Sequence, residues 1–216
     1  MPRVNADALG DHGSAARGHG PTETEPAMIE DPLRPLVERA RRGDVEAWAR
    51  LYHELIAPIT RHLRYLTGDA DSAEDLAQET FARAMVDLPS FVGRSRFSTW
   101  LHGVALNAAR RHWRKRRNGQ RAFAQLTAIA IVREANAQGE PEQAAIQRRR
   151  AAALYELLQT LPEPLREAFI LRDLEAIPLP EVAALLGISA GNVAVRASRA
   201  RARIREGLAR RGLLTG

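Results

Sequence analysis

The sequence predicts an all-α fold: two small helical domains joined by a flexible linker, the C-terminal one a helix-turn-helix. Apolar residues recur at helical spacing along two blocks, and no segment of useful length alternates apolar and polar residues. Hydrophobic residues make up 45% of the 216 residues but aromatic residues only 5%, so the apolar content is mostly Ala, Leu, Ile and Val. Such a composition suits helices packed on helices.

The N-terminal 28 residues are rich in Gly, Ala, His, Asp and Pro and have almost no large apolar side chains. They cannot bury enough surface to offset chain entropy, so we expect a disordered tail at 1–28 and a first domain over 29–117. Asp44 is a plausible N-cap, because it follows Gly43 and precedes an apolar stripe at helical spacing. That stripe contains Trp48, Leu51, Tyr52, Leu55, Ile56, Ile59 and Leu63.

Thr-Gly-Asp at 67–69 ends this helix, and a second amphipathic helix follows. Its apolar stripe is predicted to contain Ala73, Leu76, Ala77, Thr80, Phe81, Ala84, Met85 and Leu88. Pro89 and Gly93 predict a loop over 88–96. The helix after the loop carries Phe97, Leu101, Val104 and Ala108 on one face and ends in the basic run RRHWRKRR at 110–117.

Residues 118–143 are interpreted as the linker, because they contain the segments NGQ and QGEPEQ. Between these lies an apolar piece, LTAIAIV, which fits either a short helix or a segment that a partner orders. The second domain, 144–216, is predicted to contain four helices, with prolines at the start of the second and third.

Gly-Ile-Ser at 187–189 separates the last two helices, which is the layout of a helix-turn-helix. Ser189 or Asn192 is expected to cap the final helix. The buried stripe of that helix is predicted to contain Val193, Ala197, Ala200 and Ile204, with arginines off the stripe.

The positive charge is clustered. The formal net charge is +6, and the basic residues gather in 110–117 and 196–211. A cluster of cations favours a polyanion, because each phosphate contact releases counterions. A solvated surface explains any single arginine, but two clusters beside helical patterns favour nucleic acid.

Other classes of protein are excluded or disfavoured. The chain has no cysteine, which excludes disulfides and thiolate metal sites. We find no apolar run of about 18 residues and no signal peptide, so we expect a cytoplasmic protein without a membrane span. There is no phosphate-binding glycine loop, nucleophile elbow or metal-ligand spacing, so we expect neither an enzyme nor a cofactor. Neither His102 nor His112 is interpreted as a metal ligand.

Three pieces in order, DADSAEDLAQETFARA at 69–84, FVGRSRFSTWLHGVALNAARRHWRKRRN at 91–118 and the helix-turn-helix, carry a family resemblance. From about residue 35 to 210 the chain resembles bacterial RNA polymerase sigma factors of the extracytoplasmic-function (ECF) group. The resemblance implies two domains that bind core RNA polymerase, recognise the minus-ten and minus-thirty-five elements of promoter DNA and melt it. It also implies an anti-sigma factor as a partner.

The resemblance assigns roles to particular residues. The face of the 71–88 helix that docks on the polymerase is expected to present Asp75, Gln78, Glu79 and Arg83. The minus-ten element is expected to contact Phe91, Gly93, Arg94, Ser95, Arg96, Asn107, Arg110, Arg111, Arg114 and Lys115. In the family the 91–96 loop captures a flipped base, which suits single-stranded recognition. Arg111 departs from the family, in which an aspartate is common, and makes this face more cationic.

The minus-thirty-five element is expected to contact Ser189, Asn192, Ala194, Val195, Arg196, Ser198 and Arg199. Here too the chain departs from the family, which usually places polar or basic readers at 194 and 195. Ala194 and Val195 can contact a thymine methyl but cannot donate to guanine. We therefore expect few hydrogen bonds to bases and a larger contribution of DNA shape.

Two other functions are consistent with part of the sequence. A helix-turn-helix regulator that acts without polymerase docking explains residues 144–211 but leaves the 69–118 motifs without a role. A helical adaptor that binds only proteins leaves both basic clusters without a role.

Overall fold

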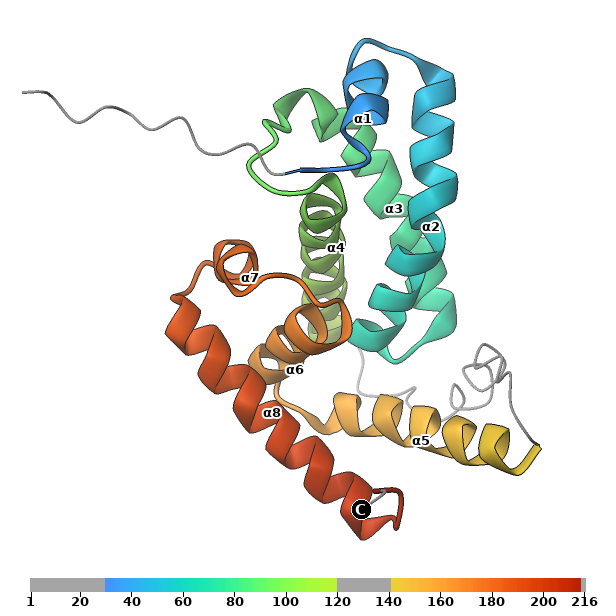
Figure 1. The fold of residues 1–216 in the computed structure, drawn as a ribbon, viewed down its shortest axis with the longest axis vertical. Helices are drawn as coiled ribbons and strands as arrows, with labels where there is room; N and C mark the ends of the chain where they lie inside the picture. The colour runs from blue at the N-terminus through green and yellow to red at the C-terminus, as the bar shows by residue number, and fades with distance from the viewer. Residues whose placement is uncertain (1–29, 120–140, 215–216) are drawn as a thin grey trace, which may run out of the picture.

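The computed structural model describes residues 30–119 and 141–214, and all regular structure in these two ranges is helical. Figure 1 shows the helices as two groups, α1–α4 and α5–α8, that lie against each other. The predicted tail and most of the predicted linker, including its apolar piece, lie outside the described residues. No helix in the described part of the chain is both long and apolar enough to cross a bilayer.

The first group begins with α1 (Arg34–Arg41) and α2 (Val45–Thr67). Asp44 caps α2 as predicted, because its carboxylate accepts a hydrogen bond from the Ala47 N–H at 3.0 Å. Gly68 ends α2 in a left-handed conformation, with φ of 72°. Asp69 then caps α3 (Ala70–Asp87). The Thr-Gly-Asp break is therefore a C-cap followed directly by an N-cap.

A short 3₁₀ turn, η1 (Leu88–Ser90), leads into the loop before α4 (Phe97–Gly119). The start of α4 is held by a residue far away in the sequence: Asp31 accepts a hydrogen bond from the Phe97 N–H at 2.6 Å. Phe97 and Leu101 are fully buried, as predicted, whereas Val104 is only partly buried. Met85 was expected on the buried stripe of α3 but is 49% exposed, so its place on that stripe was wrong.

The second group has the four predicted helices: α5 (Pro141–Thr160), α6 (Glu163–Phe169), α7 (Leu179–Leu186) and α8 (Ala190–Arg210). Pro162 precedes α6 and Pro178 precedes α7, so both helices begin at prolines as expected. Ser189 caps α8 by accepting from the Asn192 N–H at 3.2 Å. The predicted stripe of Val193, Ala197, Ala200 and Ile204 is buried.

A π-helical turn, η3 (Ile170–Leu174), follows α6 and was not predicted. Its register places Glu175 at the end of the turn, where the Glu175 N–H donates to the Ile170 carbonyl at 2.9 Å. Ala176 then adopts a φ of 52°, the left-handed region that side chains rarely occupy. Both features are local strain that the surrounding packing must offset.

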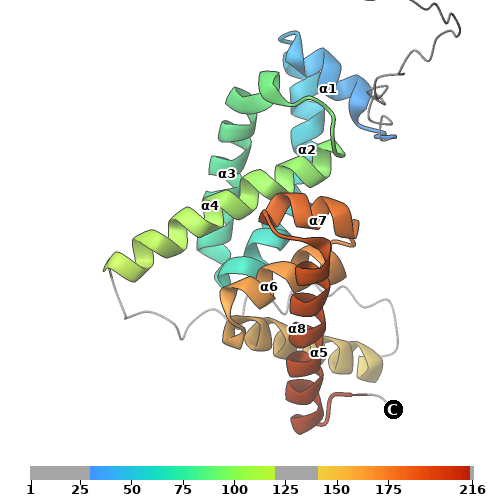
Figure 2. The same ribbon diagram turned by 90° about the vertical axis from the view of Figure 1, so that its left-hand side faces the viewer.

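The two groups are packed against each other. Helix α5 and η3 contact α2, and α7 contacts α4, beside which it lies in Figure 2. The approach of α7 is close at Gly103 of α4, where an added Cβ would lie 2.7 Å from Leu185. Tyr65 of α2 stacks on Tyr155 of α5, with ring centroids 4.9 Å apart. Nothing in the sequence indicates this closed arrangement.

Candidate nucleic-acid interface

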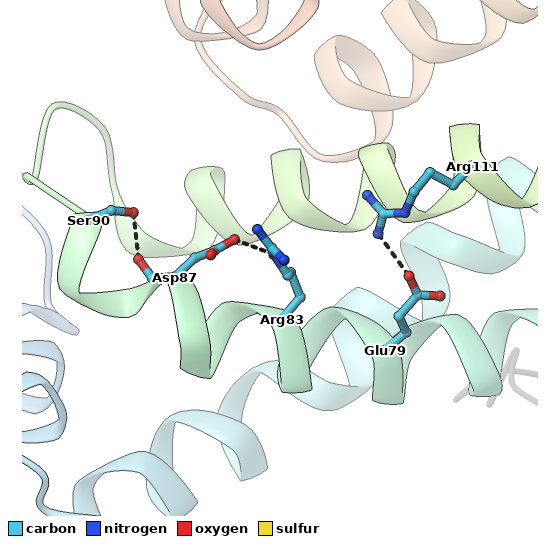
Figure 3. Close-up of polar contacts among 5 residues, drawn as sticks. All are labelled: Glu79, Arg83, Asp87, Ser90 and Arg111. Atoms are coloured by element: carbon cyan, nitrogen blue, oxygen red, sulfur yellow. Dashed lines mark hydrogen bonds and ion pairs between the residues drawn. The ribbon is translucent and has the colours of Figure 1, made fainter.

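The outer face of α3 carries the predicted docking residues. Asp75, Gln78, Glu79 and Arg83 are all exposed, because the buried stripe occupies the opposite side of the helix. Figure 3 shows two ion pairs along this face. Arg111 of α4 reaches Glu79 at 2.8 Å, and Arg83 reaches Asp87 at 2.6 Å. The face is thus an ordered row of charges that spans α3 and α4.

The 91–96 loop borders a pocket. Asp31, Arg34, Val37, Glu38 and Arg41 line it from the side of α1, together with Phe91, Val92, Gly93 and Ser95 of the loop. Charged groups on one wall and apolar groups on the other suit a planar, polar-edged ligand such as a base. Arg94 and Arg96 are exposed beside it, while Ser95 is partly buried.

Phe91 is mostly buried at the base of this loop. Its side chain is only 8% exposed and packs edge-to-face on Phe97, with ring centroids 5.5 Å apart. The ring centroid of Trp100 lies 5.3 Å from that of Phe91. Trp100 therefore packs within this aromatic cluster and does not present an open ring for stacking. Phe91 therefore anchors the loop and lines the wall of the pocket.

Arg110 departs from its expected role as a free phosphate ligand. Its guanidinium makes two hydrogen bonds to the Glu167 carboxylate of α6, at 2.7 and 2.6 Å. The hydrogen bonding that Arg110 donates to the Glu167 carboxylate raises the pKa of Arg110. Glu167 is only 3% exposed. Bidentate pairs of this kind are among the strong charged interactions in proteins. In this form Arg110 is occupied by the other domain.

The other α4 residues assigned to the minus-ten element remain accessible. Asn107, Arg111, Arg114 and Lys115 are exposed. Trp113 is partly buried, and the Arg166 guanidinium of α6 stacks over its ring at 4.8 Å. The closed arrangement therefore covers one edge of the basic helix, through Arg110 and Trp113, and leaves the other edge open.

The start of α8 is open. Ser189, Asn192, Ala194, Val195, Ser198 and Arg199 are all exposed, and Val195 is 48% exposed although it is apolar. Arg196 is partly buried and donates to the Asn192 side chain at 3.0 Å. The residues predicted to read the minus-thirty-five element thus share one surface, with Ala194 and Val195 among them.

A buried polar cluster lies between the domains. Glu175 Oε1 is 3.4 Å from Nδ1 of His62 on α2, and Glu175 Oε2 is 3.3 Å from Nε2 of His102 on α4. Burial lowers the pKa of His62 to about 4, which leaves this ring neutral near pH 7. Burial raises the pKa of Glu175, but the two facing imidazoles outweigh that and hold the pKa at about 2.

Sequence reasoning missed Glu167, Glu175 and His62, which lie where the two domains meet. A weak signal existed for two of them. His62 lies within the apolar stripe of α2, between Ile59 and Leu63, and Glu167 precedes the apolar run at 168–171. A titratable side chain inside an apolar stripe indicates a buried partner. Nothing in the sequence names that partner.

Comparisons with known proteins agree with the two groups of helices. Residues 51–119 match the family model of Sigma-70 region 2, and residues 151–204 match that of Sigma-70 region 4. The two matches cover most of α2–α4 and most of α5–α8. A helix-turn-helix regulator that acts without polymerase docking does not account for the match to region 2, so we set this alternative aside.

Among curated proteins, the chain is 33% identical to the RNA polymerase sigma-H factor of Pseudomonas aeruginosa, over 84% of this chain and 96% of that protein. It is 31% identical to the ECF RNA polymerase sigma-E factor of Salmonella typhimurium, over 77% and 88% of the two chains.

Two solved structures are also similar. CnrH in complex with the cytosolic domain of CnrY gives a TM-score of 0.61 at 25% identity, covering 82% of this chain and 97% of that one. RpoE in complex with the anti-sigma factor NepR from Bartonella quintana gives 0.59 at 26% identity, covering 74% and 95%. The chain belongs to the ECF group of RNA polymerase sigma factors, the subunits that bind RNA polymerase and direct transcription initiation.

Proposed function

We propose that this sigma factor uses three separate surfaces. The α3 face with Asp75, Gln78, Glu79 and Arg83 docks on core RNA polymerase. The 91–96 loop and α4 read the minus-ten element, and the start of α8 reads the minus-thirty-five element. The chain carries out no catalytic step, since the polymerase supplies the chemistry. It acts in the cytoplasm, with the polymerase.

The α3 face is suited to docking because its charges are ordered before the partner arrives. Glu79 and Arg83 are held by Arg111 and Asp87, so few side chains lose freedom on binding. Asp75 and Gln78 lie on the same exposed side without covering any core. A basic partner surface can pair with the carboxylates and set the register of the complex.

The loop is suited to capturing an unstacked base. Glu38 offers a carboxylate oxygen to an exocyclic amino group, while Phe91 and Val37 provide apolar contacts. Arg94 and Arg96 lie beside the pocket and can hold the flanking phosphates. Arg110 joins this surface only after it leaves Glu167, so the minus-ten surface becomes complete when the domains separate.

The start of α8 is suited to the major groove. Asn192, with a partly buried Arg196 behind it, offers an amide that can pair with adenine. Ala194 and Val195 contribute contacts to thymine methyl groups, and Arg199 holds phosphate. We therefore propose a minus-thirty-five element rich in A·T pairs.

We further propose that an anti-sigma factor regulates the chain, as NepR binds the RpoE relative. The closed arrangement of the two domains already covers Arg110. An inhibitor that prefers this arrangement need only stabilise it. Purification from the native host with a bound inhibitor supports this regulation, and a protein that is active and free of inhibitor under all conditions contradicts it.

The observation that carries the proposed function is the open α8 surface, facing solvent beside a separately exposed α3 face. Purified core polymerase with this protein is expected to give promoter-specific run-off transcription from random upstream DNA. In that assay Ala194→Arg is expected to change the preferred minus-thirty-five sequence and leave core binding unchanged. A chain that fails to bind core polymerase, or an unchanged preference, contradicts the corresponding assignment.

A further inference from the structure

The cluster of His62, His102 and Glu175 is not explained by the proposed function. His62 is fully buried and His102 is 7% exposed, and their rings lie edge-to-face with centroids 4.7 Å apart. The three side chains come from α2, α4 and the segment after η3, so the cluster exists only where the two domains meet. One nitrogen or oxygen atom from each lies within 4.8 Å of the other two.

Within the described part of the chain, most of the nitrogen and oxygen atoms that face one another in this cluster lack a hydrogen bond of good geometry. His102 Nδ1 lies 2.7 Å from the Ser98 carbonyl and must donate to it, because a carbonyl only accepts. The second ring nitrogen, Nε2, lies 3.3 Å from Glu175 Oε2 and has no hydrogen bond of good geometry to any described residue. Among the described residues, neither ring nitrogen of His62 nor Glu175 Oε1 has a hydrogen-bond partner of good geometry. Buried polar atoms left in this state destabilise a structure.

A divalent cation placed between these atoms would bind Nδ1 of His62, Nε2 of His102 and the Glu175 carboxylate, and it would leave Nε2 of His62 as the unpaired atom of this cluster. Zinc prefers imidazole nitrogen and carboxylate oxygen at roughly 2.1 Å, and neighbouring ligands of a tetrahedral site are then about 3.4 Å apart. Two of the distances, 3.4 Å from Glu175 Oε1 to His62 Nδ1 and 3.3 Å from Glu175 Oε2 to His102 Nε2, are each near that spacing, and the ligand atoms all lie within 4.8 Å of one another. A ligating histidine also usually donates its second ring N–H to a backbone carbonyl, as His102 does to Ser98.

The backbone on both sides of Glu175 has an unusual conformation, which sets the position of its carboxylate. The π-helical turn ends at Glu175, and Ala176 holds a φ of 52° that an alanine adopts only at a cost. Strain of this kind persists where the surrounding structure imposes it, and it is concentrated at functional sites. The strain and the unsatisfied nitrogens are independent observations that point to the same position.

We propose that His62, His102 and Glu175 form a binding site for a zinc-class divalent transition metal ion that joins the two domains in the closed arrangement. Three protein ligands leave a fourth position for water. The two imidazoles exclude magnesium and calcium, which prefer all-oxygen sites. The site cannot be recognised in the sequence, because 40 positions separate His62 from His102 and 73 separate His102 from Glu175.

The metal site has a consequence for Arg110. An ion that binds only the closed arrangement stabilises it by mass action, so an ion concentration of 100 times Kd shifts the closed-to-open ratio about 100-fold. The same shift keeps Arg110 on Glu167 and is expected to lower promoter-directed transcription. This last consequence rests on the proposed function, whereas metal binding does not.

The test uses the full chain, purified without a histidine tag, and zinc chloride as the probe in calorimetric titration without polymerase. We expect one tight equivalent of zinc, and binding at least about 100-fold weaker in Glu175→Gln and in His102→Gln. These variants change different domains, so the loss of binding in both identifies a shared site. His53→Gln, which changes an exposed histidine of α2, is the control and should keep the affinity.

Two further readouts separate metal binding from folding. Circular dichroism in chelator should give the same helical content for the wild type and the variants. Zinc should slow amide hydrogen exchange in α7 and η3 of the wild type by up to about 100-fold, with no slowing in Glu175→Gln. Absence of a tight equivalent in the wild type overturns the proposal. So does a tight equivalent that persists in both ligand variants, or one that His53→Gln removes.

Discussion

The two basic helices of this protein, α4 and α8, differ in how free their cations are. Helix α4 belongs to the region 2 match and has Arg110 bound to Glu167 and Trp113 stacked under Arg166, both across the domain boundary. The start of α8 belongs to the region 4 match, and its Arg199 is exposed. The arginine count alone would have treated the two helices as equivalent.

This difference indicates that closure affects the two DNA-reading surfaces unequally. The closed arrangement covers part of the proposed minus-ten surface and leaves the proposed minus-thirty-five surface exposed. We therefore expect region 4 to meet DNA before the domains separate, and region 2 to bind DNA fully only after Arg110 leaves Glu167. Substitutions at the domain boundary should change how much of the proposed minus-ten surface is covered, and substitutions on α8 should not.

The largest effect is expected for Glu167→Ala. It removes the buried partner of Arg110, which costs the closed arrangement about 3 kcal/mol, or roughly a 100-fold change in the closed-to-open ratio. Because the chain has no cysteine, single cysteines at Glu54 and Ala202 allow specific dye labelling, and energy transfer between the dyes should fall. Glu206→Ala, which removes a pair made within α8, is the matched control and should leave the transfer unchanged.

A smaller opening is expected for Gly103→Leu. Leucine favours the helix at this position, but its side chain occupies the space that Leu185 of α7 fills. Overpacking of this kind costs about 1–3 kcal/mol and should be felt at the boundary, not within α4. Energy transfer should fall while the helical content stays constant. A lower helical content with unchanged transfer contradicts the close packing of α7 on α4.

Arg199→Ala should act on α8 alone. Loss of one phosphate contact is expected to reduce the salt dependence of promoter binding by the holoenzyme, with the slope of log K against log salt falling by about 0.9. Energy transfer between the domains should not change. Arg110→Ala sharpens the contrast, because it should alter both the salt slope and the transfer. An effect of Arg199→Ala on transfer contradicts the independence of the α8 surface.

The smallest effect is expected for Arg111→Ala. Its pair with Glu79 is about half exposed on both sides, and such pairs contribute up to about 1 kcal/mol. The free energy of unfolding should therefore change by less than that, as measured by urea denaturation. A loss of several kcal/mol contradicts the interpretation of the α3 face as a solvated row of charges.

The sequence by itself predicted most of the local structure. The cap at Asp44, the break at 67–69, the four helices of the second domain and the stripe from Val193 to Ile204 depend on neighbours within a few residues, and they are confirmed. The order of motifs was also enough to indicate the family, since each motif is contiguous in the chain. The wrong prediction for Met85 shows the limit of periodicity, because the spacing of apolar residues does not tell which edge of a stripe faces solvent.

Only the tertiary structure decided how the two domains meet. Arg110 and Glu167 are 57 positions apart, and His62, His102 and Glu175 come from three elements that the sequence does not connect. The partner of a buried charge depends on the packing of whole helices, and propensity or spacing carries no information about that packing. The sequence therefore indicated a sigma factor with two basic helices, and the fold determined which of the two is partly covered in the closed form.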